Sequence, residues 1–176
     1  AHERPDVYRQ HVANTLNNLG IAQHALGDLD TALASQEEAL TIWRELAEAG
    51  LEVYGPSVAM TLTNLGNVQR ALNKLEAARC SHEESLEIRR ALSRDQPELY
   101  QPDVAMTLNN LGTVQRDLND LQGARATFEE ALRIYHALAQ ARPEVYRPDV
   151  AMTLNNLGIV RRALNDLEAA CVSYEE

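Results

Sequence analysis

The side chains best suited to chemistry in this sequence are histidines and cysteines, which ligate metals and act as acids, bases or nucleophiles. They are scattered along the chain, without the close spacing that a metal site needs. Cys80 and His82 lie two residues apart, and on a helix they would point about 200° apart, so they cannot easily bind one ion. We therefore predict no metal site. The residues are His2, His11, His24, His82, His136, Cys80 and Cys171.

Acid–base and cofactor chemistry also lacks a motif. The sequence has no glycine-rich phosphate loop and no nucleophile elbow. The pairs Glu37-Glu38, Glu83-Glu84 and Glu129-Glu130 recur at a fixed interval, which favours a solvated helix face over a single active site. We expect no cofactor and no enzymatic activity.

The glutamate pairs recur because the whole chain is a tandem repeat. The stretch from Thr107 to Gly112 reads Thr-Leu-Asn-Asn-Leu-Gly, and similar stretches end at Gly20, Gly66 and Gly158, a constant step of 46 residues. A fixed period of this size is typical of a solenoid. We expect one array over residues 1–176: the end of a preceding unit at 1–10, repeats at about 11–56, 57–102 and 103–148, and a partial repeat at 149–176.

Each repeat is predicted to hold two antiparallel helices, here called helix A and helix B. In the third repeat the apolar residues Leu108, Leu111 and Val114 share one face of a helix A at about 103–117. Ala124 and Phe128 belong to the apolar stripe of a helix B at about 121–140. Two helices cannot bury such stripes alone, so each repeat must stack on the next.

Local signals mark the ends of these helices. Proline is favoured in a first turn, so helix A is expected to begin at Pro56, Pro102 and Pro148 in successive repeats. A recurring tyrosine before each proline is expected to hold a loop against its neighbours. Asn or Gly at the end of helix A tolerates left-handed backbone, and an aspartate then caps helix B. The tyrosines are Tyr8, Tyr54, Tyr100 and Tyr146, and the aspartates are Asp28, Asp120 and Asp166.

The composition narrows the class of protein. The 176 residues are 45% hydrophobic and carry a net charge of −10, and an acidic surface repels nucleic-acid phosphates. No apolar run is long enough to span a membrane. The two cysteines occupy different places in their repeats, which favours free thiols in a reducing, cytoplasmic compartment over a disulfide. Because the first residue is Ala1, we expect a longer parent protein.

The repeats resemble the tetratricopeptide repeat family, through Leu111-Gly112 in helix A and Ala124, Phe128 and Ala131 in helix B. The family's usual unit has about 34 residues. The longer unit here, with its phrase from Pro102 to Leu111, is similar to the lengthened repeats of kinesin light chains and nephrocystin-like proteins. The resemblance implies an all-α, right-handed superhelical solenoid of antiparallel helix pairs, of a kind found in large bacterial signalling proteins. Where the family has a tyrosine in helix A, this chain has Gln23, Gln69, Gln115 and Arg161.

The resemblance also implies a concave groove, lined by the side of helix A opposite its apolar face. Asparagine amides donate and accept, so a ladder of them can hold an extended peptide backbone. Methionine adapts to varied apolar side chains, and arginines at the edge can pair with acidic groups. The candidate groove residues are Asn14, Asn17, Asn18, Met60, Asn64, Asn67, Arg70, Met106, Asn109, Asn110, Arg116, Met152, Asn155, Asn156 and Arg162.

Each of these residue types also has a structural interpretation. Asparagines repeated at one position can bond to neighbouring helices and fix the stack. Methionines can pack between adjacent A helices, and the arginines can form a solvated row of salt bridges with nearby glutamates. The sequence leaves both interpretations open.

We therefore predict an interaction scaffold that binds a peptide or extended segment of a protein partner along its inner surface, with no nucleic-acid or membrane partner. The alternative is a structural module that self-associates head-to-tail. Both end repeats expose faces that normally stack on another unit, and such contacts need not close.

Overall fold

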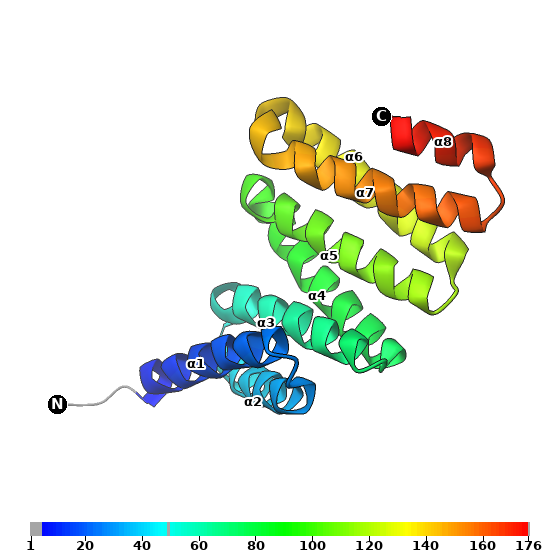
Figure 1. Cartoon of the computed structure of the whole chain (residues 1–176). Coiled ribbons are helices and arrows are strands. Elements are labelled where there is room, and N and C mark those ends of the chain that lie inside the picture. Colours follow the sequence, from blue (N-terminus) through cyan, green and yellow to red (C-terminus); the bar gives the residue numbers. More distant parts are fainter. Residues whose placement is uncertain (1–4, 49, 176) are drawn as a thin grey trace. The chain divides into compact units, whose positions relative to one another are not determined.

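The computed structural model describes residues 5–48 and 50–175, and nearly all of them lie in α-helices joined by short turns (Figure 1). No β-strand occurs in these two ranges. The chain divides into two compact units, residues 1–92 and 93–176, and each is described by itself. The helices are α1 (Pro5–Ala25), α2 (Leu29–Ala47), α3 (Leu51–Ala71), α4 (Leu75–Asp95), α5 (Pro97–Asp117), α6 (Leu121–Ala141), α7 (Pro143–Ala163) and α8 (Leu167–Glu175).

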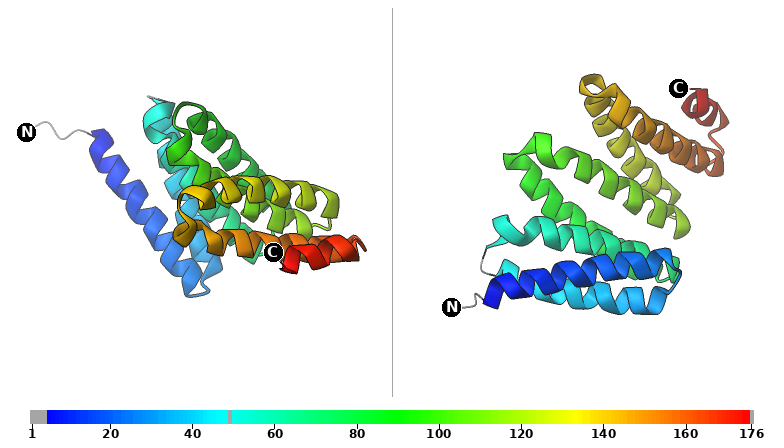
Figure 2. Two further views of the ribbon diagram at one scale, coloured as in Figure 1. Left: turned by 90° about the horizontal axis from the view of Figure 1, so that it is seen from above. Right: turned by 60° about the vertical axis from the view of Figure 1, so that its left-hand side comes forward.

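The first unit is built on the apolar stripes of its helices. α1 packs on α2 and α2 on α3, and Figure 2 shows α1 and α2 running alongside each other. Leu40 and Trp43 of α2 form a buried core with Val58 and Leu62 of α3. Ile88 of α4 packs against this core. Helix B of one repeat therefore supports helix A of the next, as stacking repeats require.

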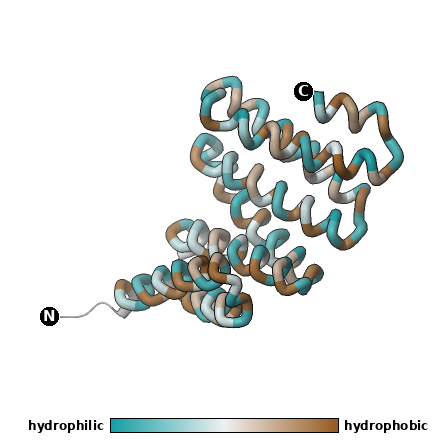
Figure 3. Tube along the Cα trace, viewed as in Figure 1, coloured by the Kyte–Doolittle hydropathy of each residue, from teal (hydrophilic) through white to brown (hydrophobic). Residues whose placement is uncertain are grey.

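The second unit follows the same scheme. α5 packs on α6, α6 on α7 and α7 on α8. The predicted apolar face of α5 is buried at Leu108, Leu111 and Val114, and Phe128 of α6 packs with Leu157 of α7. Figure 3 shows hydrophobic and hydrophilic residues alternating along the helices, as expected when one face of each is buried. None of the described helices combines the length and apolar character needed to cross a membrane.

The turn from helix A to helix B forms as predicted. Asn73, Asn119 and Asn165 have φ angles of 57°, 63° and 62°, and Gly27 has 81°. This left-handed backbone ends a helix, and Asn and Gly adopt it more readily than other residues.

The predicted aspartate caps form at two of the three positions. The Oδ1 atom of Asp120 accepts a hydrogen bond from the Gly123 N–H at 3.0 Å, and that of Asp166 accepts one from the Ala169 N–H at 3.3 Å. The prediction is wrong for Asp28, whose side chain makes no cap hydrogen bond. Thr31 occupies the matching position in α2, and its hydroxyl donates to the backbone carbonyl of Asp28 at 3.3 Å.

The A helices begin earlier than predicted. α5 and α7 begin at Pro97 and Pro143, so Pro102 and Pro148 lie inside helices, as Pro56 does in α3. A proline in the first position loses no hydrogen bond. A second proline five residues later has no N–H to donate to the preceding turn, so the helix lacks one hydrogen bond there.

The recurring tyrosines consequently lie in helices, and the expectation that they sit in a loop is wrong. The Tyr54 ring of α3 packs against Trp43, with centroids 6.2 Å apart, and the Tyr146 ring of α7 packs against Tyr135 at 6.5 Å. The Tyr54 hydroxyl also accepts a hydrogen bond from Nε2 of Gln10 at 2.8 Å. These ring contacts tie the start of a helix A to the preceding helix B.

Candidate peptide-binding surface

In each unit the two A helices contact each other, α1 with α3 and α5 with α7, so equivalent side chains lie in neighbouring positions. The first set of equivalent positions is exposed, with Asn14 and Met60 in the first unit and Met106 and Met152 in the second. The methionines expose 38%, 40% and 49% of their surface. Methionine is commonly buried, so the pair on α5 and α7 gives the second unit an apolar strip open to solvent.

The second row holds the asparagines that follow four residues later. Asn18 is exposed, and Asn64, Asn110 and Asn156 are half-buried. Nδ2 of Asn64 donates a hydrogen bond to Oδ1 of Asn17 at 3.0 Å. No described residue bonds the side-chain amides of Asn110 and Asn156. In the second unit, both asparagines of this row can therefore offer a donor and an acceptor to another molecule.

The adjacent asparagines, one residue earlier in the chain, lie differently. Asn17 and Asn109 are buried. Nδ2 of Asn109 donates to the Thr153 hydroxyl at 2.7 Å, and Oδ1 of Asn17 accepts from the Thr61 hydroxyl at 3.5 Å. Each bond joins one A helix to the next, so these two side chains hold the stack together. Asn155, the equivalent residue of α7, is exposed.

Arginines and one further asparagine border these rows. Arg70 and Arg162 are exposed, whereas Arg116 and Asn67 are half-buried. The Arg116 guanidinium donates two hydrogen bonds to Oδ1 of Asp117, at 2.9 Å and 3.2 Å. Its salt-bridge partner is thus its neighbour in sequence and not a glutamate.

A contact between glycine and helix B was not anticipated from the sequence. Gly66 and Gly112 of helix A lie against the side chains of His82 and Phe128 of helix B. A Cβ atom added at Gly112 would stand 2.9 Å from the Phe128 ring, closer than van der Waals contact allows. In the sequence, this contact is marked by the repeated Leu-Gly pair and by the residue 16 positions after the glycine, whose type varies from repeat to repeat. The other two pairs are Gly20 with Gln36 and Gly158 with Tyr174.

His82 is the titratable member of these contacts. The residue is fully buried, and neither ring nitrogen has a hydrogen-bond partner among the residues that the structure describes. Burial, and secondarily the positive charges of Arg70 and Arg89, lower the pKa of His82 from 6.5 to about 4. The ring is therefore neutral at physiological pH and serves as a packing group.

Other chemistry finds little support in the described residues. No group of three or more His, Cys, Asp or Glu side chains among them could hold a metal ion. Cys80 and Cys171 are free and exposed. Burial and the Asp149 carboxylate raise the pKa of the Tyr135 hydroxyl well above its usual value, so this phenol stays protonated.

Comparison with known families and structures agrees with this architecture. A family model described as Tetratricopeptide repeat matches residues 11–91, and a second with the same description matches residues 104–141. Together the two matches span more than half of the chain. None of the curated proteins compared with the chain matches it significantly.

Two solved structures are similar to the chain. BtubC (BKLC) from P. vanneervenii aligns over 93% of this chain with 28% identity and a TM-score of 0.76. The apo form of RapI aligns over 94% with 17% identity and a TM-score of 0.78, a likeness of fold alone. The chain spans 60% of the length of the first and 54% of the second.

Proposed function

Because the chain belongs to the tetratricopeptide repeat family, we propose that it is a non-enzymatic interaction module that binds an extended peptide segment of a protein partner across its A helices. The proposed surface in the second unit consists of Met106, Asn110, Met152 and Asn156. Equivalent positions of α1 and α3 form the proposed surface of the first unit. A reducing, cytoplasmic location is part of the same proposal.

The observation that carries this proposal is the pair of unbonded amides beside an exposed apolar strip. Asn110 and Asn156 lie in the same row of two A helices that contact each other. Each amide can donate to a peptide carbonyl and accept from a peptide N–H. Met106 and Met152, one turn earlier, offer flexible apolar surface to the side chains of the same peptide.

The test is a double variant, Asn110→Ala with Asn156→Ala, measured against peptides selected on the unmodified chain. Each lost hydrogen bond contributes about 1 kcal/mol, so we expect the affinity to fall by about 10- to 30-fold. Gln122→Ala, which removes an exposed amide from helix B, is the matched control and should bind normally. Unchanged affinity in a folded double variant would reject the proposed surface.

Head-to-tail self-association is a second candidate, favoured by the outer face of α1. Leu19 of α1 exposes 46% of its surface, whereas Leu65, its equivalent in α3, exposes 5%, and Leu26, in the turn that follows α1, exposes 84%. An exposed row of this kind is the face on which a further helix B would stack. Sedimentation velocity over a range of concentrations should then show growing oligomers, and Leu26→Glu should abolish them. A concentration-independent monomer excludes this candidate.

A further inference from the structure

Beside Met152 in the proposed surface of the second unit lies a half-buried carboxylate, that of Asp149 in α7. Asp149 comes three residues before Met152 and four residues after Val145, and both of these apolar side chains expose 49% of their surface. Residues three or four apart on a helix are neighbours. The carboxylate therefore stands between two exposed apolar side chains.

Asp149 lies on the side of α7 that faces α5. Thr153, one turn later on the same side, accepts a hydrogen bond from Nδ2 of Asn109 of α5 at 2.7 Å. The Asp149 carboxylate also raises the pKa of the Tyr135 hydroxyl of α6, and Tyr135 is 3% exposed. The carboxylate is thus placed over the line where α5 and α7 meet, here called the α5–α7 seam.

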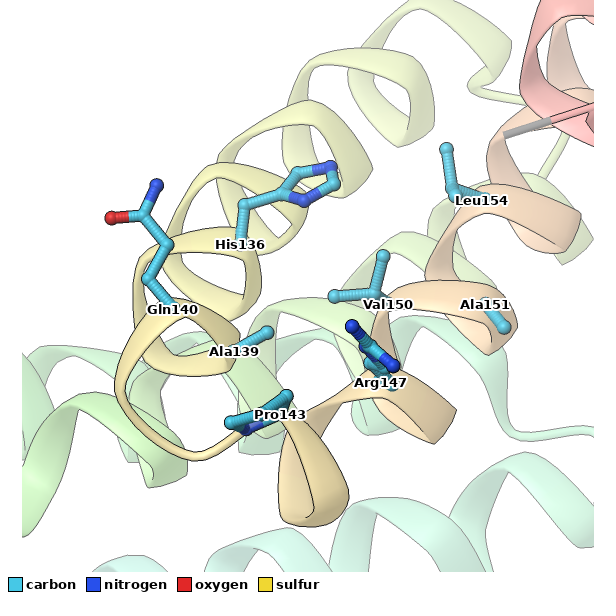
Figure 4. A pocket seen from close by; sticks show the side chains of 8 residues that line it. All are labelled: His136, Ala139, Gln140, Pro143, Arg147, Val150, Ala151 and Leu154. Carbon is cyan, nitrogen blue, oxygen red and sulfur yellow. The ribbon is translucent and has the colours of Figure 1, made fainter.

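The Asp149 carboxylate has no ion-pair partner among the described residues. Arg147 is the nearest arginine in the sequence, but side chains two residues apart on a helix point about 200° apart. Figure 4 shows Arg147 near Val150, in a hollow beside His136. Burial raises the pKa of Asp149, as expected of a carboxylate that is partly removed from water and lacks a counter-charge.

A buried acceptor at the same seam is also unbonded. Asn109 is 4% exposed, and its Oδ1 atom has no hydrogen-bond partner among the described residues. Asn109 and Asp149 both act on the Tyr135 hydroxyl, so they share one neighbourhood. The unbonded oxygen adds a partial negative charge beneath the carboxylate, and the seam therefore favours a positively charged group.

Exposed apolar side chains of α5 complete the surroundings. Leu99 and Met106 lie seven residues apart, and so on one face of the helix, and they expose 59% and 40% of their surface. Because α7 is packed against α5, this exposure persists in a stacked repeat. Lysine and arginine lay their methylene stems on apolar surface while the charged end stays in a polar place. Apolar walls around a carboxylate match such a side chain.

The first unit lacks this arrangement. Ser57 of α3 is the equivalent of Asp149, and Trp43 of α2 is the equivalent of Tyr135. The corresponding place between α1 and α3 therefore has neither the charge nor the phenol. Any preference for a positively charged side chain belongs to the second unit.

We propose that the peptide bound by the second unit carries an arginine or lysine whose charged end pairs with Asp149 and whose stem lies on the exposed apolar side chains of α5 and α7. The inference rests on the proposed function and adds the chemical class of its ligand. The net charge of −10 attracts such a segment from solution. An acidic or purely apolar segment would cover the carboxylate without supplying a counter-charge, which is unfavourable.

The test begins with short random peptides displayed on phage and selected on the full chain. We expect the selected peptides to share an arginine or lysine. A library that yields no binder rejects the proposed function, and the inference with it. Binders that depend on Asn110 and Asn156 but share no basic residue leave the proposed function in place and overturn the inference alone.

A selected peptide is then labelled and titrated into the chain, with fluorescence anisotropy as the readout. Asp149→Asn should weaken binding at least about 10-fold, because a hydrogen bond between charged groups is lost. Replacing the peptide's basic residue with citrulline, a neutral side chain with the shape of arginine, should weaken binding by a similar factor. The two losses should not add, since both remove the same pair.

Glu144→Gln is the matched control. Glu144 is exposed on the same helix, and it lies five residues before Asp149, about 140° away around the helix axis. The substitution removes an equal charge outside the seam and should leave binding unchanged. Circular dichroism should show that both variants keep their helix content. Unchanged affinity in Asp149→Asn, equal losses in the two variants, or additive losses with the citrulline peptide would each overturn the proposal.

Discussion

At the scale of single residues, the contact between the repeated glycine and helix B decides how well each repeat packs. The glycine brings helix A close to one large side chain, which is Gln36, His82, Phe128 or Tyr174 in successive repeats. The side chain that faces the glycine therefore differs in polarity and rigidity from repeat to repeat. The responses to acid and to mutation should differ accordingly.

His82 should make the first unit sensitive to acid. Unfolded, this histidine takes up a proton near pH 6.5, whereas in the fold its pKa is about 4. Its packing is therefore undisturbed above pH 6.5, and stability should fall as the pH drops from 6.5 to 4, by up to about 3 kcal/mol. His82→Phe, which copies Phe128, and His82→Gln, which copies Gln36, should both remove this decline. Urea unfolding at pH 7 and pH 4.5 measures it, and an unaltered decline in both variants would contradict the assignment.

Gly112→Ala should destabilise the chain more than Gly158→Ala. The new methyl group at 112 meets the buried Phe128 ring, and overpacking of this kind costs about 1–3 kcal/mol. Alanine recovers about 1 kcal/mol of helix propensity. At 158 the methyl group meets Tyr174, which is 48% exposed and can swing aside, so that variant should melt at or above the temperature of the parent. Thermal melts followed by circular dichroism compare them, and equal losses would count against the packing argument.

At the scale of helices, the N-terminal caps give a matched pair. Asp120 accepts a hydrogen bond from the Gly123 N–H, whereas Asp28 makes no side-chain cap bond in the equivalent place. Asp120→Ala should therefore cost about 1 kcal/mol, and Asp28→Ala should cost less. Denaturant unfolding of the two variants gives the difference directly. A larger loss for Asp28→Ala would show that cap geometry is not the cause.

The helices also show which features could be predicted from sequence. Asn119-Asp120 ends one helix and starts the next through local backbone preferences, so these boundaries were predicted correctly. Pro97 and Pro102 carry the same local signal, so nothing in the sequence tells which of them begins the helix, and α5 begins at Pro97. The expected start at Pro102 was therefore wrong.

The residues of the candidate surface likewise could not be predicted fully from local sequence signals. Asn109 and Asn110 are identical in type and adjacent in sequence, so both were predicted to line the groove. Asn109 is buried against Thr153 of the next A helix, whereas no described residue bonds the side-chain amide of Asn110. Their rotation about the helix axis relative to α7 makes the difference, and no local pattern specifies it. The peptide-binding role of this surface stays a prediction.

At the scale of the whole molecule, the division into two compact units should be visible in hydrogen exchange. Lowering the pH from 7 to 5 should destabilise the unit that contains His82, residues 1–92. In the other unit, burial raises the pKa of Asp149, so its folded carboxyl takes up a proton more readily than the unfolded one, and acid favours the fold there. After correction for intrinsic rates, exchange should accelerate more in 51–92 than in 97–163. Equal acceleration would mean that the units unfold together.

The burial of Trp43 gives the protein an internal spectroscopic reporter. It is the single tryptophan of the sequence, it is 3% exposed and in tilted ring contact with Tyr54, and it lies within residues 1–92. Its fluorescence emission should therefore follow the loosening of that region alone, while far-ultraviolet ellipticity sums over every helix. The offset between the two melting curves measures how strongly the halves of the chain are thermodynamically coupled, without any label or substitution.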